Sequence, residues 1–154
     1  MEENEMRLVI AQGEGQTIEF KRHWNASEID GVLVSFANSA GGTLYIGIND
    51  DGSVHGIDPP EKWKEAEHKI TSVCLSCRPP LHPEFQRLEY QGKTLMAVTV
   101  ARSPDVHSTG GGTIYARTGS STHPVGPEEQ VRLLQDHGKL ATDRFLVREA
   151  RYSD

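Results

Sequence analysis

The stretch SFANSAGGTLYIGINDDG, residues 35–52, contains the end of one helix, a buried strand and a tight turn. Thr43 to Ile48 is a near-continuous apolar run, which predicts a central strand buried on both faces. Gly41-Gly42 ends the preceding helix, and the residues from Asn49 to Gly52 are typical of a turn. That helix is expected to be capped by Ser27. Its apolar residues recur at three- and four-residue spacings, at Ile29, Val32, Leu33, Phe36, Ala37 and Ala40.

The chain on either side of this stretch predicts more strands and two further helices. Short strands are expected at 7–11 and 17–21, a hairpin at 84–90 and 94–101, and a last strand at 113–117. A second helix begins at Pro59-Pro60 and a third near 126–129. Strands and helices do not alternate strictly, so we predict an α+β fold with a mixed sheet packed with about three helices. The domain is expected to cover residues 1–137, with 138–154 as a C-terminal tail.

Composition limits the function classes. The chain has 154 residues, 36% hydrophobic and 25% charged, which suits a single globular domain. It contains no apolar run long enough to cross a bilayer and no secretory signal, so we expect a cytoplasmic protein with no membrane partner. The formal net charge of −6 excludes a uniformly basic nucleic-acid binder. Any contact with nucleic acid must therefore come from a local basic cluster.

Three carboxylates are candidates for a metal site. Glu14 precedes the expected strand at 17–21, Glu19 lies on its polar face, and Asp50 follows the central strand. If these strands are neighbours, the three acids could converge on Mg²⁺ or Mn²⁺, which prefer oxygen ligands and can activate water for attack on a phosphodiester. Lys21 shares the face of Glu19 and could meet a phosphate. The alternative is a solvated strand face and an ordinary turn.

A second candidate site is the run RTGSST, residues 117–122. Arg117 offers a bidentate donor, and Ser120 is among the hydroxyls that follow it, so the run could bind phosphate. Arg102, Lys21 and Arg22 could join it. The alternative is an ordinary polar turn.

Cys74 and Cys77, with His82 nearby, have a spacing that zinc sites use. Both cysteines also lie on the apolar stripe of the second helix, where a thiol packs as a small hydrophobe. We therefore predict buried structural cysteines and do not expect zinc.

Three motifs in order resemble one family. They are EGQTIEFK (14–21), SFANSAGGTLYIGINDDG (35–52) and YARTGSST (115–122), with Glu128-Glu129 where the family's last helix begins. The family is the Schlafen group with its Alba-type domain, and the resemblance covers about residues 14–134. It implies an α+β fold and nucleic-acid binding. In animal members it implies a metal-dependent endoribonuclease acting on transfer and ribosomal RNA, with catalytic acids that carry over to Glu14, Glu19 and Asp50. Animal members use two lobes where this chain has one, so a homodimer could rebuild their clamp.

Three functional hypotheses remain open. The first is a Mg²⁺- or Mn²⁺-dependent endoribonuclease that cleaves structured RNA such as transfer RNA. The second is a non-catalytic regulatory module that binds DNA or RNA, with RNA favoured as the partner. The third is an interaction domain in which the acids are only surface charge.

Overall fold

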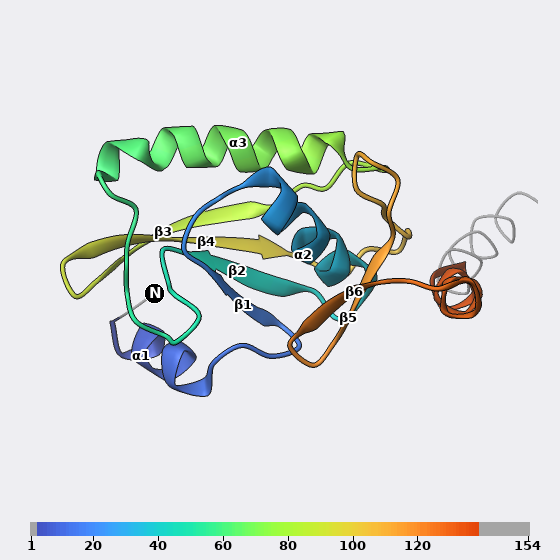
Figure 1. Cartoon of the computed structure of the whole chain (residues 1–154), viewed down its shortest axis with the longest axis horizontal. Helices are drawn as coiled ribbons and strands as arrows, with labels where there is room; N and C mark the ends of the chain where they lie inside the picture. Colours follow the sequence, from blue (N-terminus) through green and yellow to red (C-terminus); the bar gives the residue numbers. More distant parts are fainter. Residues whose placement is uncertain (1–2, 139–154) are drawn as a thin grey trace, which may run out of the picture.

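The computed structural model describes residues 3–138. A four-stranded sheet lies between two helical layers, with α2 and α3 on one face and α1 on the other (Figure 1). The helices are α1 (Glu3–Gln12), α2 (Ala26–Asn38), the short 3₁₀ helix η1 (Pro60–Lys62) and α3 (Trp63–Ser76). Residues 127–138 are also helical. The predicted α+β class and mixed sheet are confirmed.

The order of strands in the sheet is β1-β2-β4-β3. β1 pairs with β2 in parallel, and the other two pairs are antiparallel. A separate two-stranded sheet, formed by β5 and β6, packs against α2. The strands are β1 (Ile18–Lys21), β2 (Gly42–Ile46), β3 (Glu84–Tyr90), β4 (Lys93–Val100), β5 (Tyr115–Thr118) and β6 (Ser121–Pro124).

The two central strands are buried on both faces, as the apolar run at 43–48 predicts. In β2, Leu44 and Ile46 pack with α2 and α3, whereas Tyr45 packs with α1. β4 alternates in the same way, because successive side chains of a strand point to opposite faces. The sheet therefore has a hydrophobic core on each side.

The expected strand at 7–11 is wrong, because these residues belong to α1. The short apolar run at 8–11 does not by itself distinguish a strand from a helix face. Met6, Val9 and Ile10 lie three and four residues apart, and they pack together under the sheet. Leu8 points away from this cluster and is 70% exposed.

Two local expectations also need correction. α2 begins one residue before the expected cap Ser27, with Asn25 as its N-cap and no side-chain capping bond. The strand near 113–117 is not the last one, because β6 follows it and the run 117–122 forms a β-hairpin. Gly119 takes a left-handed φ of 58° in the turn of this hairpin.

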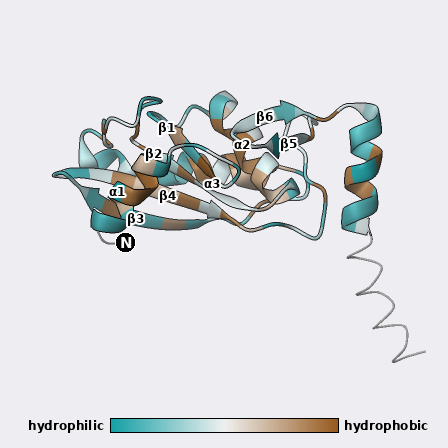
Figure 2. Cartoon of the chain, turned by 90° about the horizontal axis from the view of Figure 1, so that it is seen from below, coloured by the Kyte–Doolittle hydropathy of each residue, from teal (hydrophilic) through white to brown (hydrophobic). Residues whose placement is uncertain are grey.

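At the far end of the molecule, the last described helix stands beyond the β5–β6 hairpin (Figure 2). It contacts the domain through His137, which is 2% exposed and lies with Nε2 3.2 Å from the backbone oxygen of Asn38. Apart from Gly138, the expected tail lies outside the described residues, so the predicted domain boundary stays a prediction. Within residues 3–138, no helix has the length and apolar character needed to cross a membrane.

We predict that Gly42→Ala destabilises the fold by about 1–3 kcal/mol, the usual cost of overpacking a core. A Cβ at this position would lie 2.5 Å from two ring carbons of Phe36, which is fully buried. Chemical denaturation measures the change. Gly126→Ala is the matched control, since a Cβ there meets nothing within 4 Å. Equal stabilities for the two variants would contradict the close packing of α2 on β2.

Candidate nucleic-acid interface

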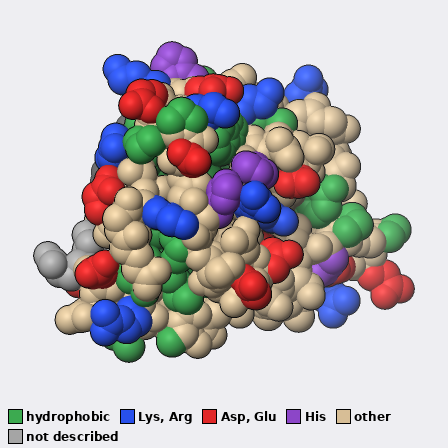
Figure 3. Space-filling view, turned by 60° about the vertical axis from the view of Figure 1, so that its left-hand side comes forward, with side chains coloured by type: hydrophobic (Ala, Val, Ile, Leu, Met, Phe, Trp, Pro, Cys, Tyr) green, Lys and Arg blue, Asp and Glu red, His purple; other side chains and the backbone are tan. Residues whose placement is uncertain are grey.

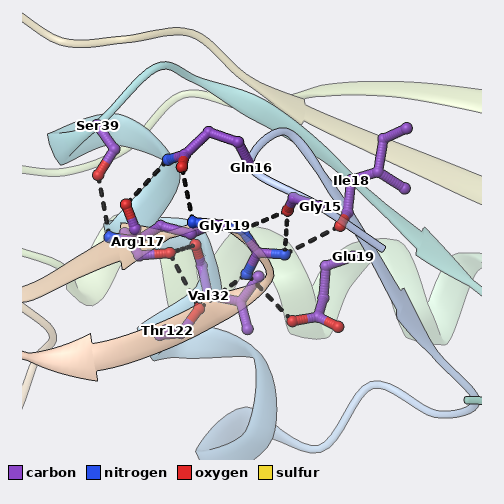
Figure 4. Close-up of polar contacts among 10 residues, drawn as sticks. Gly15, Gln16, Ile18, Glu19, Val32, Ser39, Arg117, Gly119 and Thr122 are labelled. Carbon is purple, nitrogen blue, oxygen red and sulfur yellow. Dashed lines mark hydrogen bonds and ion pairs between the residues drawn. The ribbon is translucent and has the colours of Figure 1, made fainter. Parts of the chain in front are cut away.

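Arg117, predicted to bind phosphate, is instead buried inside the fold, with 4% of its surface exposed. It lies on β5 and reaches across to β1 (Figure 4). All five of its guanidinium N–H groups are used, because Nε and Nη2 donate to the backbone and Nη1 donates to two side chains. The acceptors are the carbonyls of Gly15 and Ile18, the carboxylate of Glu19 and the hydroxyl of Thr122, at 2.7–3.2 Å.

The guanidinium also lies over the Phe36 ring, with Cζ 4.9 Å from the ring centroid. Gln16 reinforces the same junction, because its amide donates to the Arg117 carbonyl and accepts from the Gly119 N–H. In this arrangement Arg117 has no donor left for a phosphate. Its role is to join the β5–β6 hairpin to β1.

The three predicted metal ligands do not form a cluster in this structure. Among the described residues, no three His, Cys, Asp or Glu side chains lie close enough together to hold a metal ion. The cause is the direction of the strands. Glu14 precedes β1 and Asp50 follows β2, and because these strands are parallel, the two acids lie toward opposite ends of strands roughly 15 Å long.

The three acids also differ in their surroundings. Glu19 is 7% exposed, and its Oε1 lies 3.2 Å from Nη1 of Arg117 in a buried ion pair. Glu14 is half-buried in the bend before β1, and Asp50 is exposed in the turn after β2. The chemistry expected of these acids, metal binding and catalysis, stays a prediction.

The other predicted nucleic-acid contacts separate into two groups. Lys21 pairs with the last residue of β2, and Arg22 follows it, exposed. Arg102 lies at the opposite end of the sheet, two residues after Val100, which pairs with the first residue of β2. Ser120 is exposed in the hairpin turn, on the side where Gly119 bonds to Gln16 upstream of β1. The side chains of Lys21, Arg22, Arg102 and Ser120 therefore do not form one continuous binding surface.

The end of the sheet that carries Lys21 and Arg22 gathers other basic groups that sequence reasoning missed. We call Arg22, His23, His55 and Lys93 the basic cluster. The rings of His23 and His55 meet edge to face, with centroids 5.5 Å apart. Lys93 begins β4, and its Nζ donates to the carbonyl of Val54 at 3.0 Å. Figure 3 shows histidine and basic side chains side by side near the centre of one face.

The positive charge of the basic cluster affects the pKa of His55. Its pKa is lowered, first by desolvation and then by the positive charges of Arg22, His23 and Lys93, while Asp58 acts in the opposite direction. Neighbouring cations disfavour the protonated imidazole, which is the sign expected where positive charges crowd together. Such a site favours an anion.

The cysteines are buried as predicted, with Cys74 at 0% and Cys77 at 2% exposure. Burial raises the pKa of the Cys74 thiol to about 12 and that of the Cys77 thiol to about 11. Thiols held this firmly in the protonated form are poor metal ligands and poor nucleophiles.

We predict that Glu19→Ala destabilises the protein by about 3–5 kcal/mol, because it leaves the buried guanidinium of Arg117 without its counter-ion. Glu19→Gln keeps an acceptor for Nη1 and should cost clearly less. Urea denaturation followed by circular dichroism measures both variants. Equal losses, or no loss in either, would show that the ion pair does not hold the hairpin to β1. Any functional test at this position should therefore use Glu19→Gln.

Solved structures resemble this chain. A crystal structure of a Corynebacterium diphtheriae protein matches with a TM-score of 0.57 and 20% identity, over 71% of this chain but only 22% of that protein, and this likeness concerns the fold alone. The solution structure of the N-terminal domain of a RecG-related protein from Nitrosomonas europaea, named for an ATP-dependent DNA helicase, matches with a TM-score of 0.50. Its identity is 29%, over 65% of this chain and 72% of that domain. No curated protein sequence matches significantly. The family described as Schlafen, AlbA_2 matches residues 14–126, and the chain belongs to that family.

Proposed function

We propose that this protein is a nucleic-acid-binding module whose basic cluster contacts the phosphate backbone. The observation that carries the proposal is the gathering of Arg22, His23, His55 and Lys93 at one end of the sheet in a protein of net charge −6. These residues come from three segments: the end of β1, the loop after β2 and the start of β4. Guanidinium, imidazole and ammonium groups are the side chains that bind phosphate oxygens.

Two comparisons support this proposal. The chain belongs to the Schlafen, AlbA_2 family, and one structural relative is named for a DNA helicase. The proposal corresponds to the second hypothesis drawn from the sequence, the binding module without catalysis. RNA preference, a homodimer and a cytoplasmic location stay predictions.

The nuclease hypothesis needs a rearrangement that the binding module does not need. A metal held by Glu14, Glu19 and Asp50 would have to draw together acids on opposite ends of β1 and β2. It would also compete with Arg117 for the Glu19 carboxylate. The residues as they stand thus do not fit a three-carboxylate metal site, and the structure favours binding over cleavage.

We predict that the double variant Arg22→Gln/Lys93→Gln weakens binding to both RNA and DNA by roughly tenfold or more, because two phosphate contacts are lost. The slope of log K against log salt should fall by about one for each contact removed. Fluorescence anisotropy with labelled transfer RNA, single strands and duplexes, at several salt concentrations, measures both effects. Arg102→Gln is the control, since this exposed arginine lies at the other end of the sheet.

Several outcomes of this experiment would contradict the proposal. Unchanged affinity in the double variant, or an equal loss in Arg102→Gln, would mean that the basic cluster is not the interface. Affinity that does not change with salt would exclude phosphate binding altogether. The same reactions with Mg²⁺, Mn²⁺ or chelator report on catalysis. Metal-dependent cleavage that is lost in Glu19→Gln would replace the binding module with the nuclease.

We also predict that affinity rises as pH falls from about 8 toward about 5.5, the range in which histidine gains its charge. A bound phosphate favours protonated His55 and so raises its pKa, which desolvation and then the charges of Arg22, His23 and Lys93 lower in the free protein, against the opposite effect of Asp58. Binding therefore takes up protons. The variant His23→Gln/His55→Gln should lose this pH dependence in anisotropy titrations.

His82→Gln is the control for this test, since His82 is exposed on the loop before β3 and outside the basic cluster. If the double histidine variant keeps the full pH dependence, the histidines do not contact the nucleic acid.

A further inference from the structure

A cleft on the described surface lies beside the basic cluster, between the start of α2 and the exposed side of α3. Its volume is about 1020 Å³. Its wall combines the aromatic ring of Trp24 with the polar and charged side chains of Lys64, Glu65, His68 and Lys69. None of these residues belongs to the basic cluster.

Trp24 forms the rigid wall of the cleft. It is half-buried and packs against the core cluster shared by α2 and α3, so part of its indole is held in place by the fold. The remaining surface of the ring faces the cleft that it lines. A fixed, partly exposed indole can stack on another flat ring without a large loss of side-chain entropy.

The side of α3 that borders the cleft is positively charged. Lys64 and Lys69 are both exposed and contribute two positive charges, and Glu65 contributes one negative charge, which leaves +1 with His68 neutral. This local sign is opposite to that of the whole chain, which has a net charge of −6. The cleft is thus suited to a ligand that combines a flat apolar ring with an anionic group.

The cleft is continuous with the basic cluster. Trp24 follows His23 in the chain, and their rings meet with centroids 6.3 Å apart. His23 in turn contacts His55 of the cluster. A single strand bound along the cluster can therefore extend into the cleft.

We propose that this cleft binds an unpaired nucleotide of a single-stranded segment, with its base on Trp24 and its phosphate at Lys64 and Lys69. The inference rests on the proposed nucleic-acid binding and specifies the form of nucleic acid. Stacking on aromatic side chains is the usual way in which proteins hold single strands. Bases inside a duplex are already stacked on their neighbours and cannot enter a cleft of this kind.

Tryptophan fluorescence tests the proposal directly, because the chain has two tryptophans, Trp24 and Trp63. In Trp63→Phe, Trp24 is the sole reporter. Single-stranded oligonucleotides should quench its emission in step with binding measured by anisotropy. A duplex of the same length, held only by the basic cluster, should bind with little quenching.

Affinity measurements on variants separate the cleft from the cluster. Trp24→Ala should lower the affinity for single strands by about tenfold and leave duplex affinity unchanged, while Trp24→Phe should restore much of the loss because it keeps a ring. Lys64→Gln/Lys69→Gln should weaken single-strand binding and reduce its salt slope. Lys62→Gln is the matched control, since Lys62 is exposed on the neighbouring turn but does not line the cleft.

The outcomes distinguish this inference from the function on which it rests. Binding that requires Arg22 and Lys93 but ignores Trp24, Lys64 and Lys69, with no quenching, overturns the cleft and leaves the proposed function intact. Equal effects of Trp24→Ala on single strands and duplexes also overturn it. If neither form of nucleic acid binds the wild-type protein, both proposals fail. Circular dichroism of each variant confirms that a loss of affinity is not a loss of folding.

Discussion

The buried guanidinium of Arg117 is the interaction on which the architecture of this domain depends. A cation without solvent is tolerated only when it is paired and its hydrogen bonds are satisfied, and here all five N–H groups find acceptors. Most of the acceptors lie in and just before β1, about one hundred residues earlier in the chain. The guanidinium therefore joins the β5–β6 hairpin to β1, although the two segments are far apart in the chain. An arginine followed by hydroxyl residues resembles a phosphate-binding loop in sequence. In this fold, however, the arginine bonds to residues in and just before β1 and has a structural role.

The sequence predicts the helices and strands of this protein better than it predicts how the strands pair and in which direction they run. Residues 35–52 could be predicted because helix periodicity, a glycine pair and a two-sided apolar run all agree. The helix at Glu3–Gln12 could not, since a short apolar run fits either a strand or a helix face and tertiary packing decides between them. The convergence of Glu14, Glu19 and Asp50 depended on how β1 runs relative to β2. Spacing along the chain does not contain that information, and the parallel pairing separates Glu14 from Asp50.

The same parallel pairing creates the basic cluster that sequence reasoning missed. Residues that follow two adjacent parallel strands meet at the same edge of a sheet, which brings Arg22 and His23 beside His55. β4 runs antiparallel to β2 and begins at this edge, so Lys93 joins them. With the parallel pairing known, the basic cluster could have been predicted from the sequence, because basic residues follow β1, follow β2 and begin β4. Scattered along seventy residues, they form no recognisable motif.

An acidic protein can bind a polyanion when its positive charges are concentrated and its negative charges are distant. At physiological ionic strength the screening length is about 8 Å, so acids farther away contribute little to the field that a bound phosphate meets. The basic cluster and the cleft beside Trp24 lie next to one another; Asp58 acts on His55 in the cluster, and Glu65 lines the cleft. The remaining negative charge still acts at longer range and low salt, where it opposes non-specific association. Such a charge distribution favours ligands that fill both sites at once, a phosphate backbone with an accessible base, over a uniform rod of charge.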